Sequence, residues 1–196
     1  MSEPRLLHRE LTLEEWAELP EDEPGELVDG RLEEEEMPSG VHELVGGWFV
    51  QMLSNWLVPR GGFVLTCDAK YAVAPRRGRK PDVSVYLPGR ARTSLRASLL
   101  RKPPSIAVEI VTPTPRDVRR DRIEKSKDYA AAGVSWYWLV DPEARTMEVL
   151  ELGADGRYTL AAAATAGHLV VPGCEGLSLD LDALWAHVDR WIEEAT

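Results

Sequence analysis

Three short apolar segments do most to limit the folds open to this chain: residues 82–87, 105–111 and 136–140. Each is rich in β-branched or aromatic residues, and proline or a turn residue follows soon after each one, which is typical of β-strands. The last two are apolar enough for burial on both faces of a sheet. A sheet of this kind needs helices on its two sides.

The sequence supplies such helices. Apolar side chains recur at helical spacing in residues 41–58 and 181–192, and a further helix is predicted over residues 116–132, ending at Gly133. The helix over residues 181–192 is expected to turn Trp191 and Ile192 inward with its other apolar residues. Residues 145–152 and 157–164 predict a hairpin before it. The order of elements therefore predicts an α/β fold: a central mixed sheet flanked by helices, followed by a C-terminal hairpin and helix.

Local signals define the first part of the chain. Residues 12–15 fit a capping box at the start of a short helix. Residues 26–32 predict a hairpin whose Asp29-Gly30 turn favours positive φ at both central positions. Residues 63–74 indicate one long strand or a pair of strands, and residues 75–78 indicate a turn.

Length and composition suit a protein inside the cell. The 196 residues are enough for one domain, which we expect to span residues 1–196. The two cysteines, Cys67 and Cys174, match no metal-binding spacing and favour a reducing cytoplasm. No apolar run approaches the roughly 20 residues of a membrane span, and the first residues lack a signal-peptide pattern. We therefore expect a cytoplasmic protein with no membrane partner.

Charge is distributed unevenly along the chain. The formal net charge is −10, yet residues 70–127 hold 16 Lys/Arg against 5 Asp/Glu. Two acids stand inside this basic stretch, Asp82 at the start of one predicted strand and Glu109 near the end of another. Basic side chains can bind phosphate groups, and a pair of carboxylates can bind a divalent cation. The combination indicates a phosphodiester substrate, although a basic stretch is more often only a solvated face.

Phosphodiester hydrolysis gives each of these groups a task. Asp82 and Glu109 can hold Mg²⁺ or Mn²⁺ with oxygen ligands, and the backbone carbonyl of Ile110 can add one more. A lysine beside the second acid would help to orient the attacking water, but Val111 stands at that position. Lys125 is the candidate substitute, because Asp121, Lys125 and Tyr129 share one face of the next helix. Tyr129 itself is expected to pack in the core.

Several short motifs resemble the PD-(D/E)XK nuclease superfamily, and within it the Uma family of restriction-endonuclease-like proteins. The principal ones are Lys80-Pro81-Asp82-Val83-Ser84 and Val108-Glu109-Ile110-Val111-Thr112-Pro113. The others lie, in order, at residues 26–30, 38–42, 121–129, 133–134 and 137–142. Each motif is short, but their order and spacing over about residues 12–152 make the resemblance fairly specific.

The resemblance implies a restriction-endonuclease-like fold and Mg²⁺-dependent cleavage of nucleic acid, with DNA as the expected substrate. It carries Asp82 over as the motif aspartate and Glu109 as the second acid. Lys125 fits a lysine that has moved to the following helix, and Glu26 matches a recurrent acidic position. The side chains expected to contact substrate are the following: Arg79, Lys80, Arg116, Arg120 and His42.

Three readings of the sequence stay open at this point. The first is a metal-dependent endonuclease, plausibly a homodimer because cutting both strands of a duplex calls for two sites. The second is an inactive module on the same fold that binds nucleic acid or protein, with Val111 marking decay of the site. The third is a structural dimer whose basic stretch meets an acidic protein. Loss of metal-dependent plasmid nicking in Asp82→Ala and Glu109→Ala separates the first reading from the others.

Overall fold

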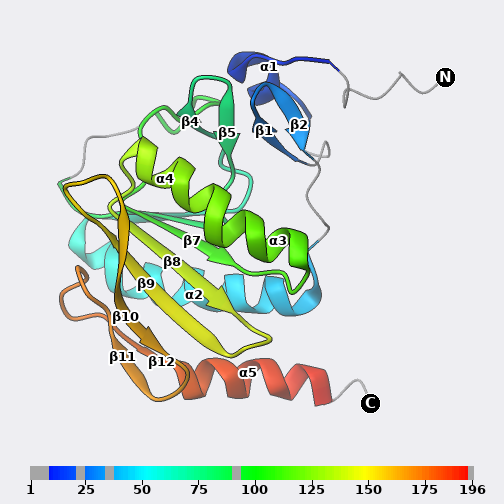
Figure 1. Cartoon of the computed structure of the whole chain (residues 1–196). Helices are drawn as coiled ribbons and strands as arrows, with labels where there is room; N and C mark the ends of the chain where they lie inside the picture. The colour runs from blue at the N-terminus through cyan, green and yellow to red at the C-terminus, as the bar shows by residue number, and fades with distance from the viewer. Residues whose placement is uncertain (1–8, 21–24, 34–37, 90–93, 194–196) are drawn as a thin grey trace.

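A six-stranded mixed sheet forms the centre of the molecule (Figure 1). The computed structural model describes residues 9–20, 25–33, 38–89 and 94–193. The strands run in the order β10-β9-β8-β7-β6-β3, and only β7 and β8 are parallel. Their bounds are β3 Phe63–Thr66, β6 Val83–Tyr86, β7 Ile106–Ile110, β8 Trp136–Asp141, β9 Thr146–Leu152 and β10 Tyr158–Ala164. The mixed central sheet predicted from the apolar segments is confirmed.

Helices cover both faces of this sheet (Figure 1). On one face lie α2 (Gly40–Leu57) and α5 (Leu181–Glu193). The apolar residues of α2 repeat at helical spacing and are fully buried against the sheet: Val45, Phe49, Leu53 and Leu57. Burial of one such side chain stabilises the fold by about 1.5–3 kcal/mol, so this helix is a main support of the core. A short 3₁₀ helix, η2 (Val58–Arg60), follows α2.

The opposite face carries the helix predicted over residues 116–132, which is continuous but not uniform. It consists of α3 (Pro115–Arg119), a π-helical segment η3 (Arg120–Lys125) and α4 (Ser126–Ala132). The Tyr137 hydroxyl donates a hydrogen bond of 2.9 Å to the Asp121 carbonyl inside η3. The wider turn of a π segment changes which side chains face the sheet, and such segments are frequent at functional sites.

A smaller sheet stands beside the main one, with strand order β2-β1-β5-β4. Its bounds are β1 Glu26–Val28, β2 Arg31–Glu33, β4 Tyr71–Ala74 and β5 Arg77–Arg79. The Asp29-Gly30 hairpin is confirmed, with φ values of 52° and 82°. Residues 63–74 are two strands in different sheets, and part of the turn expected at 75–78 belongs to strand β5.

A short helix, α1 (Leu13–Ala17), packs on this smaller sheet and has the predicted capping box at Thr12. The ring of Trp16 is almost fully buried. A Cβ atom at Gly78 would lie 2.2 Å from this ring, so only glycine fits there. The contact fixes β5 close under α1 and so positions Arg79, the last residue of β5.

The C-terminal part contains the predicted hairpin of β9 and β10 and the predicted helix α5. It also contains a small sheet of β11 (His168–Val170) and β12 (Ser178–Asp180). The expectation that Trp191 and Ile192 point inward is wrong, because their exposed fractions are 52% and 50%. They lie in the last turn of α5, beyond the residues that reach the sheet. Among the described residues, no helix combines the length and apolar character needed to span a membrane.

Candidate active site

Asp82 directly precedes β6, and Glu109 belongs to the neighbouring strand β7. Val83 at the start of β6 pairs with Val108 in β7, so Asp82 lies beside Glu109 and Ile110. The Asp82 Oδ2 atom accepts a hydrogen bond of 2.7 Å from the backbone N–H of Ile110. Side chains alternate along a strand, and Glu109 therefore points to the face covered by α4 while Val108 points to the other face.

Lys125 lies in the centre of a group of carboxylates. Its Nζ atom is 2.8 Å from Glu109 Oε2, 3.5 Å from Glu26 Oε1 and 3.8 Å from Asp121 Oδ1. The side chain is only 2% exposed. Lys125 thus reaches Glu109 from the helix, although Val111 stands at the strand position where a lysine was expected. A single ammonium group serves three buried acids.

Glu26 is the most firmly held of these acids. It is almost fully buried in β1, accepts 2.6 Å from Arg79 Nη1, and accepts 2.7 Å from the backbone N–H of Lys80. Burial by itself would raise the pKa of this carboxyl, but Lys125 and Arg79 together lower it below its ordinary value. Glu26 is therefore ionised at neutral pH, and its negative charge has a fixed position in the site.

Arg79 has a different position from the one expected. The side chain has no exposed surface, so direct contact with a substrate phosphate is excluded, and the expectation of such a contact was wrong. Its guanidinium instead links Glu26 to Asp128 of α4, with contacts of 2.8 Å from Nε and 2.7 Å from Nη2 to Asp128 Oδ2. Arg79 therefore orients Glu26.

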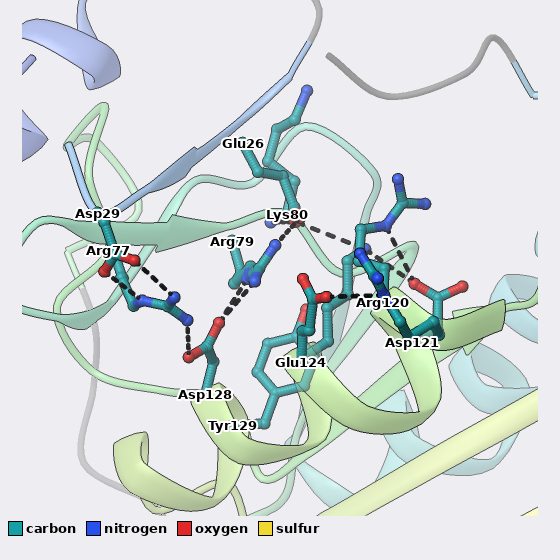
Figure 2. A network of polar contacts seen from close by, with 12 residues as sticks. Glu26, Asp29, Arg77, Arg79, Lys80, Arg120, Asp121, Glu124, Asp128 and Tyr129 are labelled. Carbon is teal, nitrogen blue, oxygen red and sulfur yellow. Dashed lines mark hydrogen bonds and ion pairs between the residues drawn. The ribbon is translucent and has the colours of Figure 1, made fainter. Parts of the chain in front are cut away.

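The same network continues outward to the surface, as Figure 2 shows. Asp128 also accepts a hydrogen bond of 2.7 Å from Arg77 Nη1, and Arg77 in turn binds both carboxylate oxygens of Asp29 at 2.9 and 3.1 Å. The chain of contacts joins the turn of the β1–β2 hairpin to the buried acid in β1. Because bidentate arginine–carboxylate contacts are strongly directional, the network fixes the small sheet against α4.

Glu109 has the opposite electrostatic environment to Glu26. Its Oε1 atom accepts a hydrogen bond of 2.5 Å from the Tyr129 hydroxyl, while Oε2 contacts Lys125. Burial raises the pKa of Glu109 well above its ordinary value, and the charges of Asp82, Asp121 and Glu26 raise it further against the lowering effect of Lys125. A cation near Glu109 would therefore stabilise the ionised form of this carboxyl.

His42 lies next to Asp82, at the first turn of α2. Ser39 caps this helix by accepting a hydrogen bond from the His42 N–H. The imidazole Nε2 is 3.2 Å from Asp82 Oδ2. Burial opposes protonation, but the hydrogen bond and the charge of Asp82 raise the pKa of His42 above its ordinary value. The partly exposed ring can therefore carry a positive charge at the edge of the site.

The remaining expected substrate contacts have mixed positions. Arg116 is exposed on α3. Arg120 is largely buried and bound to Asp117 at 2.6 Å and Asp121 at 3.4 Å, so it supports the site from within. Lys80 is partly buried, with its Nζ 4.0 Å from Asp68. The basic stretch of the sequence is thus neutralised in part by acids from elsewhere in the chain, among them Glu26, Asp128 and Glu148.

The donor atoms of the site suit Mg²⁺. Asp82 and Glu109 offer carboxylate oxygens beside a backbone strand end, and Mg²⁺ in proteins commonly takes one or two carboxylates and completes its shell with water. Within the described ranges, no three histidine, cysteine, aspartate or glutamate side chains are arranged as a metal-binding group. Asp82 and Glu109 are the two acids that would hold such an ion, and the Lys125 ammonium contacts Glu109, Glu26 and Asp121.

Two features of the site were missed in the sequence. Tyr129 was assigned to the core, but its hydroxyl holds Glu109; its position four residues after Lys125 was the available signal. The role of Asp128 had no signal, because it depends on the small sheet packing against α4. In contrast, the shared face of Asp121, Lys125 and Tyr129 was predicted, and all three are buried around Glu109.

The comparison with solved structures supports the fold. The chain is similar to a protein described as a "putative nuclease belonging to DUF820" from Anabaena variabilis ATCC 29413, solved by crystallography. The TM-score is 0.70 and the sequence identity 22%, and the match covers 91% of this chain and 99% of the other. At this identity the match establishes a common fold. A search of curated proteins finds no match.

A family model covers most of the sequence. The model of the Uma2 family, described as "Putative restriction endonuclease", matches residues 12–182. The matched region contains Glu26, Asp82, Glu109 and Lys125, the residues that the fold brings together. This chain belongs to the Uma2 family of restriction-endonuclease-like proteins.

Proposed function

We propose that this protein is a Mg²⁺-dependent endonuclease that hydrolyses phosphodiester bonds of DNA. One observation carries the proposal: Lys125 contacts Glu109 at 2.8 Å, and Asp82 accepts a hydrogen bond from the N–H of Ile110, the residue after Glu109. Two carboxylates and an amine are the groups that metal-assisted hydrolysis of a phosphodiester requires. Family membership supports nuclease activity, and the chemistry of the donor set supports the choice of metal.

In this proposal Asp82 and Glu109 hold the metal, with the Ile110 carbonyl as a possible further oxygen ligand. The metal, when bound, polarises a phosphate oxygen and makes a water molecule more acidic. Tyr129 keeps Glu109 oriented through its hydroxyl, and Glu26 keeps Lys125 in place by its charge. The Lys125 ammonium can donate a proton or a hydrogen bond to the negative charge that develops on the phosphate.

The phosphate backbone would approach from the side of His42 and Arg116. His42 is partly exposed beside Asp82, and Arg116 is exposed at the start of α3. A positive charge on His42 would attract the backbone close to the metal-binding carboxylates. Lys80, which follows Arg79 directly and lies with its Nζ 4.0 Å from Asp68, would add a further cation for the backbone.

Plasmid nicking tests the proposal. The purified protein should convert supercoiled plasmid to open circles in Mg²⁺ or Mn²⁺, and Asp82→Ala and Glu109→Ala should each lower the rate by at least about 100-fold. Asp155→Ala, in the β9–β10 turn, is a matched acidic control that should retain full activity. Binding of DNA by the parent protein without any nicking would contradict the proposal and favour the inactive binding module.

We also propose that the protein acts in the cytoplasm as a homodimer. Both cysteines, Cys67 and Cys174, are free thiols. The two helices on one face, α2 and α5, carry tryptophans, and Trp191 is half exposed. Light scattering after gel filtration should give twice the mass of 21.9 kDa. A mass that stays at one chain, at every concentration up to 100-fold above that of the nicking assay, would contradict the dimer.

A further inference from the structure

A cavity of about 370 Å³ lies beside the candidate active site. It is formed by the start of α2, the end of α5 and the turns that follow β7 and β8, which lie at one side of the molecule in Figure 1. The apolar part of its wall comes from two prolines, Pro113 and Pro142, and from five larger side chains: Val41, Val111, Trp185, Val188 and Ile192. Its volume lies within the range of about 300–1,000 Å³ that is typical of small-molecule pockets.

His42 connects this cavity to the catalytic groups. The imidazole lines the cavity, and its Nε2 atom is also 3.2 Å from Asp82 Oδ2. Val111 lines the cavity as well, and it follows Glu109 by two residues, just after the end of β7. A group held in the cavity would therefore lie next to a phosphate bound at Asp82 and Glu109.

The charges around the cavity do not suit a second phosphate. Glu143 and Asp189 are part of its wall, and the one arginine, Arg145, is already bound to Asp189 at 2.6 Å. These two carboxylates face the Arg145 guanidinium and the His42 imidazole, so the wall has no excess of positive charge that would hold a second phosphate. Apolar walls with a few carboxylate oxygens suit instead a flat, uncharged ring that carries N–H donors, which is the chemistry of a nucleobase.

We propose that this cavity receives one unstacked base of the nucleic-acid substrate, adjacent to the phosphate that is cut. The inference rests on the proposed nuclease function and specifies its substrate: a single strand, or a duplex opened locally at the cleavage site. A base that leaves the stack costs a few kcal/mol, least in a single strand, and a fitted pocket offsets that cost. Glu143 and Asp189 would favour bases with exocyclic amino groups.

Abasic scanning tests the base pocket directly. A single-stranded oligonucleotide is cut by the parent protein in Mg²⁺ while one abasic site is moved through the positions around the cleavage site. Removal of the base that enters the pocket should lower kcat/KM about tenfold or more, because the contacts of that base with the pocket are lost. Abasic sites at the other positions should have a smaller effect.

Variants that fill the cavity test whether the pocket causes the dependence of cleavage on that base. Ile192→Trp enlarges a half-exposed side chain at its wall, and should lower cleavage of the intact strand about tenfold while leaving cleavage of the sensitive abasic strand unchanged. Val41→Trp, from α2, should act in the same way. Leu160→Trp is the matched control on β10, with a similar exposed fraction of 60%, and should change neither rate. Melting temperatures verify that each variant is folded.

Two results would overturn the inference while leaving the nuclease proposal intact. One is equal cleavage by the parent protein of intact strands and of every abasic strand. The other is an equal effect of Ile192→Trp on intact and abasic strands. A parent protein that cuts no nucleic acid under any of these conditions refutes the nuclease function itself, and the base pocket with it.

Discussion

Replacement of Lys125 by methionine should destabilise the protein strongly, although methionine fills nearly the same space. The ammonium group is the shared partner of Glu109, Glu26 and Asp121, at 2.8, 3.5 and 3.8 Å. Loss of one member of a buried ion pair costs about 3–5 kcal/mol, because the remaining charge stays buried without compensation. With three carboxylates left together, we expect Lys125→Met to lower the free energy of unfolding by about 3–5 kcal/mol at pH 7.

Urea denaturation followed by circular dichroism measures this loss. Lys127→Met is the matched control, since Lys127 is exposed on the same helix and its replacement should change the free energy by no more than about 0.5 kcal/mol. The loss in Lys125→Met should shrink as the pH falls, because protonation of Glu109, whose pKa is raised, relieves the repulsion. It should also shrink when Mg²⁺ or Mn²⁺ is added, because a divalent cation can replace the missing charge.

The reasoning would be refuted by a Lys125→Met protein as stable as the Lys127→Met control at pH 7. Such a result would mean that the carboxylates are protonated or hydrated in the native protein and need no cation. A loss of stability that stays constant between pH 5 and pH 8 would also contradict it, because the cost would then come from packing and not from charge.

Three further predictions follow from the site. Glu109→Gln should raise the free energy of unfolding at pH 7, and more at pH 8 than at pH 6. Folding raises the pKa of the Glu109 carboxyl, so the parent protein loses stability as the pH rises, and glutamine removes this effect. Urea titrations that show a lower free energy of unfolding for Glu109→Gln would contradict this. Asp128→Asn should lower the free energy of unfolding by about 3 kcal/mol, since Arg79 is buried against it; Asp155→Asn is the control, and equal stability of the two would sink the idea. Dialysis against EDTA should abolish plasmid nicking and Mg²⁺ should restore it; nicking that persists without metal would exclude the proposed chemistry.

The central fold was predictable because its signals are local. Short apolar runs predict the strands β6, β7 and β8, and helical spacing of apolar residues predicts α2 and α5. The Asp29-Gly30 turn predicts its hairpin. The end of α5 was predicted wrongly because periodicity alone cannot show where the sheet beneath a helix ends. Trp191 and Ile192 continue the apolar pattern past that point.

The residues of the candidate site were predictable in part, but the balance of charge among them was not. The order of motifs led us to expect Asp82, Glu109 and Lys125 near one another. In the structure Lys125 contacts Glu109, and Asp82 accepts a hydrogen bond from the N–H of Ile110. Arg79 shows what sequence position cannot supply. It stands in a basic run next to Lys80 and Pro81, yet β5 carries it under α1 and into full burial against Glu26. Such pairing depends on contacts between residues about 50 positions apart.

Diffraction from crystals soaked in Mn²⁺ is the most direct test of the claim that Asp82 and Glu109 share one divalent ion. We expect an anomalous peak bound to an oxygen of each carboxylate, at about 2.0–2.2 Å, the distance usual for a small divalent cation. The Lys125 ammonium should remain within a few ångströms of that ion. Absence of a peak between the two carboxylates at saturating Mn²⁺, in crystals whose Asp82 and Glu109 are well ordered, would contradict it.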